Sequence, residues 1–143
     1  MAVYTDVGHE ELSAFVALYD VGDVLSAKGI EEGVENSNYQ LTTTKGVFVL
    51  TLYEKRVKTE DLPFFLGLKE HLAGKGVSCP IPVRARDGTI FNSLCYRPAA
   101  IVTFLDGVWP RSINANHCAQ LGTALAELHL AGSDFVKTRV NDL

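Results

Sequence analysis

The chain has 143 residues, which is enough for one ordinary domain with a buried core. Its formal net charge is −4 and its Lys and Arg residues are scattered, so the sequence offers no basic surface to a nucleic acid. It has no apolar run long enough to cross a bilayer and no secretory signal at residues 1–6, so we expect a cytoplasmic protein without a membrane partner.

The first predicted element is a short amphipathic helix. Four apolar residues recur at the spacing i, i+3, i+4 and i+7 of one helix face: Leu12, Phe15, Val16 and Tyr19. Gly8 is the candidate N-cap, with Glu11 at the third helical position. Gly22 ends the element.

After Gly22 the spacing of apolar residues changes from a helical pattern to one typical of strands. Residues 24–30, 39–44 and 47–53 are rich in β-branched and apolar side chains, and the last of these segments reads as buried on both faces. Turn-forming residues fill positions 31–38, and Lys45-Gly46 makes a tight turn. Such short connections predict an antiparallel meander, because parallel pairing needs a long crossover.

A second helix is predicted to begin near Thr59 or Asp61, with Pro63 in its first turn. Its expected apolar face contains Phe65, Leu68 and Leu72, and Gly74 and Gly76 end it. The prolines of residues 79–82 require an extended segment, since each disfavours the helical region for the residue before it.

Asp87-Gly88 predicts a hairpin between residues 83–86 and 89–94. A further strand is expected over 98–105, and a long helix over 113–131 with Gly132 after it. Four residues of that helix share one face: Cys118, Leu121, Leu125 and Leu128. The helix needs a partner to cover this face, so we expect the chain to be part of a longer protein. The order of elements predicts an α+β fold with a mostly antiparallel sheet of about five strands.

Several kinds of catalytic site are excluded. No G-x-S-x-G or H-E-x-x-H motif occurs, and no cysteine joins a histidine at zinc-ligand spacing, so we assign no catalytic and no metal-binding residue. The three cysteines, Cys79, Cys95 and Cys118, are expected to be reduced. Glu31, Glu32 and Glu35 lie on a turn and are expected to face solvent.

The segment 29–53 is the candidate binding element. A glycine-bearing turn between antiparallel strands can bring backbone N–H groups against phosphate oxygens, and Asn36, Ser37 and Asn38 add short donors. Glycine and asparagine also build hairpins that bind nothing. However, a strand, a turn, two more strands and a helix are typical of the opening of protein-kinase-like lobes, in which a mobile loop covers the ATP phosphates. Residues 102–107 then stand where such lobes have their hinge.

At this point the chain resembles the bacterial homoserine kinases of the kinase-like fold, relatives of aminoglycoside and choline phosphotransferases. The matching stretches are G-I-E-E-G-V-E-N-S-N-Y at 29–39, F-V-L-T-L-Y-E at 48–54, D-L-P-F-F at 61–65, C-P-I-P at 79–82, R-P-A at 97–99 and H-C-A-Q-L-G-T-A-L-A-E-L-H at 117–129. They follow the family's order over nearly the whole chain.

The resemblance implies an ATP-dependent transfer of the γ-phosphoryl group to the hydroxyl of L-homoserine, a step toward threonine. Residues 1–107 would be the nucleotide-binding N-lobe, and 108–143 the linker and first helix of a C-lobe that the chain lacks. The residues expected to cover the triphosphate are Gly33, Val34, Glu35, Asn36, Ser37 and Asn38. The adenine-facing hinge is expected at Thr103, Phe104 and Leu105, and Mg²⁺ ligands are expected in the missing lobe.

Two departures qualify the resemblance. Many kinase-like lobes carry a phosphate-binding lysine in the third strand, where this chain has Thr51, and Lys55 lies near the strand's end. The histidine-aspartate catalytic loop and the metal-binding aspartate are also absent, since His129 has no aspartate two residues on and Asp142 only follows Asn141. We therefore expect the chain alone to be inactive. Two alternatives remain: a kinase of this fold for choline, methylthioribose or an aminoglycoside, and a non-catalytic α+β binding module.

Overall fold

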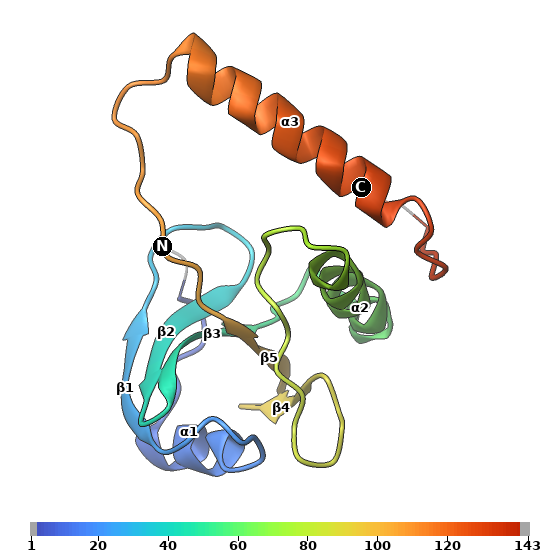
Figure 1. The fold of residues 1–143 in the computed structure, drawn as a ribbon. Coiled ribbons are helices and arrows are strands. Elements are labelled where there is room, and N and C mark those ends of the chain that lie inside the picture. Colours follow the sequence, from blue (N-terminus) through green and yellow to red (C-terminus); the bar gives the residue numbers. More distant parts are fainter. Residues whose placement is uncertain (1–2, 141–143) are drawn as a thin grey trace.

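The computed structural model describes residues 3–140, so Asp142 and the end of the predicted 108–143 unit lie outside the described residues. Its centre is one five-stranded antiparallel sheet in the order β1-β2-β3-β5-β4 (Figure 1). The strands are β1 (Val24–Gly29), β2 (Ser37–Thr43), β3 (Gly46–Leu52), β4 (Asn92–Leu94) and β5 (Arg97–Thr103). The antiparallel meander predicted from short turns is therefore confirmed.

Two helices cover opposite faces of the sheet. Helix α1 (His9–Val16) packs on the face that carries Leu50 and Leu52, and Glu11 accepts the N–H of Gly8 as expected at its start. Helix α2 (Leu62–Gly74), which follows the 3₁₀ turn η1 (Thr59–Asp61), packs on the face that carries Tyr53 and Ala100. The alternation of side chains along a strand sends these residues of β3 and β5 to different sides.

The buried face of α2 differs from the predicted one. Leu62, Leu66 and Leu72 are buried, whereas Phe65 and Leu68 are half-buried. The reason is a second contact: the segment after α3 returns to α2, where Phe135 meets Phe64 at 5.6 Å between ring centroids. Apolar residues of α2 thus divide between the sheet and this segment.

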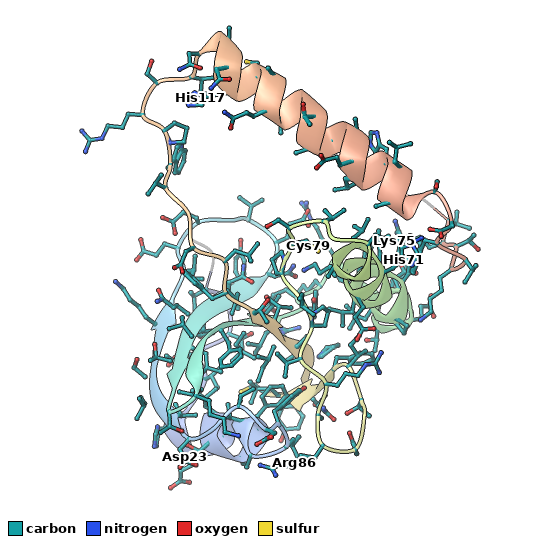
Figure 2. The ribbon with its side chains drawn as sticks, in the orientation of Figure 1. Asp23, His71, Lys75, Cys79, Arg86 and His117 are labelled. Atoms are coloured by element: carbon teal, nitrogen blue, oxygen red, sulfur yellow. The ribbon has the colours of Figure 1, made fainter. Side chains whose placement is uncertain are left out.

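Polar contacts fix the same segment to α2. His71 and Lys75 project from α2 toward it (Figure 2), and the carboxylate of Asp134 lies 2.8 Å from His71 Nε2 and 2.6 Å from Lys75 Nζ. These two bonds hold the pKa of Asp134 below its usual value, the one to Lys75 more strongly. The end of α3 (Ala115–Gly132) is therefore tied to α2.

The predicted hairpin around Asp87-Gly88 is wrong in its flanking strands. The turn itself forms, with Gly88 at a φ of +87° and the N–H of Ala85 donating to Thr89 O at 2.9 Å. The preceding residues instead pair with the end of β5, where Val83 N–H donates to Ile101 O at 2.8 Å. Strand β4 pairs with the start of β5, so beyond the bonds of the turn itself both flanks lie along one edge of that strand.

Strand β5 is also shorter than expected, because it ends at Thr103 and leaves Phe104 and Leu105 exposed. A long connection then leads to α3, which Figure 1 shows standing away from the sheet. The expected uncovered face of this helix is observed, with Leu121, Leu125 and Leu128 exposed by 61%, 46% and 37%. No helix among residues 3–140 is both long and apolar enough to span a membrane.

Candidate functional site

The candidate site is the connection between β1 and β2, called here the loop and defined as residues 30–36. It begins with a backbone bond in which Ile30 N–H donates to Asn38 O at 2.8 Å. Gly33 has a φ of +117°, a conformation that L side chains rarely adopt, so glycine is required there. Val34 is 78% exposed at the tip, so the loop protrudes from the sheet instead of packing on it.

The start of β2 distributes its side chains to both faces of the sheet. Asn38 points to the α2 face, where its Oδ1 accepts a hydrogen bond from Thr51 Oγ1 at 2.8 Å. Thr51, which the resemblance puts at the position of the strand lysine, is thus hydrogen-bonded to β2. Ser37 points to the α1 face and is fully buried.

The hydroxyl of Ser37 is fully engaged. It accepts the N–H groups of Tyr4 and Thr5 at 2.9 and 3.0 Å and donates to Glu54 Oε1 at 2.6 Å. The structure therefore brings Gly33, Val34, Glu35 and Asn36 together in the exposed loop, and it separates the side chain of Ser37 from that of Asn38. The Ser37 side chain is therefore not available to a ligand of the loop.

The other predicted residues lie at the far end of β5. Thr103 is bound to the extended segment beside it, since its N–H donates to Ile81 O and its Oγ1 accepts Ile81 N–H, both at 2.9 Å. Phe104 and Leu105 follow in the connection toward α3 and present partly exposed side chains. The loop and this predicted hinge thus lie at opposite ends of the sheet, since β1 ends at the loop and β5, antiparallel to β3, ends at the hinge.

A cavity of about 380 Å³ adjoins the loop. It is lined by Tyr4, Val34, Glu35, Glu54, Lys55, Arg56 and Arg97. Lys55 thus faces the same space as Glu54. An exposed ion pair at 3.1 Å joins Arg56 to Glu35, but such a surface pair contributes little stability.

Sequence reasoning missed Glu54 and Arg97. Glu54 is 8% exposed, and its Oε2 lies 2.6 Å from Nε of Arg97. One sequence signal could have found Glu54, because it directly follows the predicted strand 47–53, which reads as buried on both faces. A charged side chain in such a place needs an oppositely charged or hydrogen-bonding partner. Tyr53, on the other face, is buried against α2, and this burial raises its pKa to about 12.

The described residues contain no metal centre. Within residues 3–140, no three His, Cys, Asp or Glu side chains gather closely enough to bind a metal ion.

Comparison with known proteins shows which family the sequence resembles. The model of the "Phosphotransferase enzyme family" matches residues 26–142. Curated homoserine kinases of Nitrobacter winogradskyi, Bradyrhizobium sp. and Rhodospirillum rubrum are 64%, 62% and 60% identical over the whole chain. The chain spans 44% of the length of each of these relatives.

A solved structure has the same fold at low sequence identity. The crystal structure of a spectinomycin phosphotransferase in complex with ADP and spectinomycin superposes with a TM-score of 0.68 at 14% identity. The superposition covers 89% of this chain and 39% of that protein. This similarity bears on the fold alone.

Proposed function

The chain belongs to the phosphotransferase enzyme family, and from that premise we propose that it is the nucleotide-binding lobe of a homoserine kinase. The complete protein would transfer the γ-phosphoryl group of ATP to the hydroxyl of L-homoserine. The observation that carries the proposal is the identity of 60–64% with homoserine kinases over all 143 residues. The relatives' greater length supports the presence of a second lobe in the complete protein.

In this proposal the loop covers the triphosphate with backbone N–H groups. The residues proposed to cover it are Gly33, Val34, Glu35 and Asn36 of the loop together with Ser37 and Asn38 at the start of β2, and the buried side chain of Ser37 takes no part. Support comes from the protruding tip and from the left-handed backbone of Gly33, which allow close approach of a phosphate. Thr103, Phe104 and Leu105 would face the adenine.

Phosphoryl transfer also requires Mg²⁺ and a carboxylate near the attacking hydroxyl. The residues described here do not fit the metal, since they include no suitable cluster of carboxylates or imidazoles. We therefore place both functions in the other lobe, and we divide the chain into an N-lobe of residues 1–107 and a linker with the first C-lobe helix at 108–143. The exposed apolar face of α3 supports this division, because such a face requires a partner.

A substrate panel tests the proposal. The complete protein is assayed for ADP release with ATP and L-homoserine, choline, methylthioribose or an aminoglycoside as acceptor. We expect turnover with L-homoserine at a kcat/KM far above the others. Preference for another acceptor would replace the substrate but keep the kinase, whereas ADP release with none of them would favour a binding module.

The 143-residue chain alone is the matched control. It should transfer no phosphoryl group, because it lacks the catalytic carboxylates, and it should bind ATP weakly in a calorimetric titration. Each tenfold loss of affinity corresponds to about 1.4 kcal/mol, so loss of the second lobe's contacts is readily measured. A tight ATP complex with the chain alone would contradict the proposed division of the site.

A further inference from the structure

A buried carboxylate lies directly behind the loop. Glu54 lies two residues after the end of β3, and its Oε1 accepts hydrogen bonds from Ser37 Oγ at 2.6 Å and from Thr5 Oγ1 at 2.7 Å. Its Oε2 is paired with Arg97 Nε at 2.6 Å. Three segments that are far apart in the sequence thus converge on one side chain, and both of its oxygens are satisfied.

Glu54 contacts the end of the loop through its backbone as well. Its N–H donates to Asn36 Oδ1 at 3.2 Å, while its carboxylate binds Ser37, the next residue along the chain. These are the two residues at which the loop returns to the sheet. Glu54 therefore contacts both residues through which the loop rejoins the sheet.

The residues before α1 add a second set of contacts. The N–H groups of Tyr4 and Thr5 donate to the same Ser37 hydroxyl, and Tyr4 Oη donates to Val34 O at 3.0 Å, at the loop's tip. Thr5 also accepts from Tyr39 Oη through its carbonyl at 2.6 Å. The cavity of about 380 Å³ lies on this side of the loop, so apolar side chains of the described residues do not pack against the loop there. These hydrogen bonds hold the loop instead.

Stability alone does not account for this arrangement. A buried ion pair recovers little more than the cost of removing its charges from water, and an apolar group of similar volume is often at least as stabilising. What a carboxylate adds is a defined geometry, since the hydroxyls of Ser37 and Thr5 and the guanidinium of Arg97 must approach its oxygens along particular directions. The arrangement thus fixes the position of Ser37 relative to Glu54.

We propose that Glu54 is a positioning residue, which fixes the loop through Ser37 and Asn36 in the conformation that receives the ATP phosphates. The assignment of the phosphates to the loop rests on the function proposed above. The fixing of the loop is a property of this chain and is tested without a nucleotide.

The test compares Glu54→Gln and Thr5→Val with the control Glu70→Gln. Glu54→Gln removes the negative charge that pairs with Arg97 while the volume is kept, and its single amide oxygen can accept on only one of the two sides. Thr5→Val removes the hydrogen bond that Thr5 Oγ1 donates to Glu54 and the one that it accepts from Arg97 Nε, and it leaves the charges intact. Glu70 forms two bonds with Arg84, at 2.8 and 2.7 Å, so the control breaks an ion pair that does not contact the loop.

Hydrogen exchange of the 143-residue chain gives the first measurement. We expect amides of residues 30–36 to exchange at least about tenfold faster in Glu54→Gln and about threefold faster in Thr5→Val, with β3 and β5 unchanged. The control should leave the loop unchanged. Equal loop exchange in all four proteins would overturn the inference, as would an increase of the same size across the whole sheet, which marks a purely structural role.

Steady-state kinetics of the complete protein give the second measurement. Glu54→Gln should raise the KM for ATP about tenfold or more and leave the KM for the acceptor unchanged, because only the phosphate-binding loop is displaced. An unchanged KM for ATP, with faster loop exchange, would overturn the link between Glu54 and ATP. A wild-type protein without kinase activity would instead refute the proposed function, and the exchange measurement would still decide whether Glu54 fixes the loop.

Discussion

Burial of Tyr53 predicts a specific loss of stability at alkaline pH. Tyr53 follows β3 and is only 9% exposed, in a cluster with Leu62, Leu66 and Ala100 beneath α2. Removal of the phenol from water raises its pKa from 10.0 to about 12. The phenolate is therefore much less favourable in the folded chain than in the unfolded one.

The direction of this pKa shift determines how the free energy of unfolding changes with pH. Because the pKa of Tyr53 is higher in the folded state, its contribution to stability is complete below pH 10 and is lost as the pH rises from 10 toward 12. A difference of two pKa units corresponds to about 2.7 kcal/mol. At about pH 11.5, the wild type should therefore have lost about 2 kcal/mol through Tyr53 alone.

The variant Tyr53→Phe isolates this contribution. It keeps the aromatic ring in the cluster and removes the ionisable hydroxyl, whereas Tyr19 and Tyr39, whose pKa values burial also raises, remain in both proteins. Urea unfolding measures the free energy of unfolding at pH 8 and at about pH 11.5. The decrease between the two pH values should be about 2 kcal/mol smaller in Tyr53→Phe than in the wild type.

Tyr96→Phe is the matched control, because Tyr96 is fully exposed on the turn between β4 and β5. Its decrease should equal that of the wild type. If Tyr53→Phe lost as much stability as the wild type, the phenol would be ionising without a penalty, and the reasoning from burial would be refuted.

Two further predictions concern β3 and α3. Thr51→Val removes the hydrogen bond to Asn38 and should lower the free energy of unfolding by about 1 kcal/mol, whereas Thr123→Val on the exposed helix should change it much less; equal effects would contradict the structural role of Thr51. Leu125→Glu should reduce self-association of the chain in light scattering without lowering its melting temperature, because Leu125 is 46% exposed on the uncovered face of α3. Unchanged association would show that this face is not the one that associates.

Most of the fold could be predicted because its signals are local. Alternation and β-branched residues located β2 and β3, and the tight turn at Lys45-Gly46 determined their antiparallel pairing. The edge of β5 could not be predicted in this way. Its outer partner changes from β4 to residues 81–83 partway along the strand. Which segment pairs with which part of this edge depends on the three-dimensional arrangement and leaves no local signal in the sequence.

The site was predicted in outline, and one error of two residues changed the role of Ser37. The predicted strand began at Tyr39, but β2 begins at Ser37. Because side chains alternate along a strand, this extension places Ser37 on the same face as Tyr39 and Leu41, where it is buried. The contacts of Glu54 were out of reach for a different reason, since Thr5 and Arg97 lie more than 40 residues from it in the sequence.

The two polar side chains near the end of β3 suggest how the loop is held without a strand lysine. Thr51 binds Asn38 on the α2 face, and Glu54 binds Ser37 and Asn36 from the α1 side. The first residues of β2 are thus fixed from both faces of the sheet. A strand lysine acts as a point charge, so it attracts a phosphate group from several directions. Backbone N–H groups bind a phosphate group only when they already point at it. We infer that a lobe that lacks this lysine depends more strongly on the fixed position of its loop, which is why Glu54 should affect the KM for ATP.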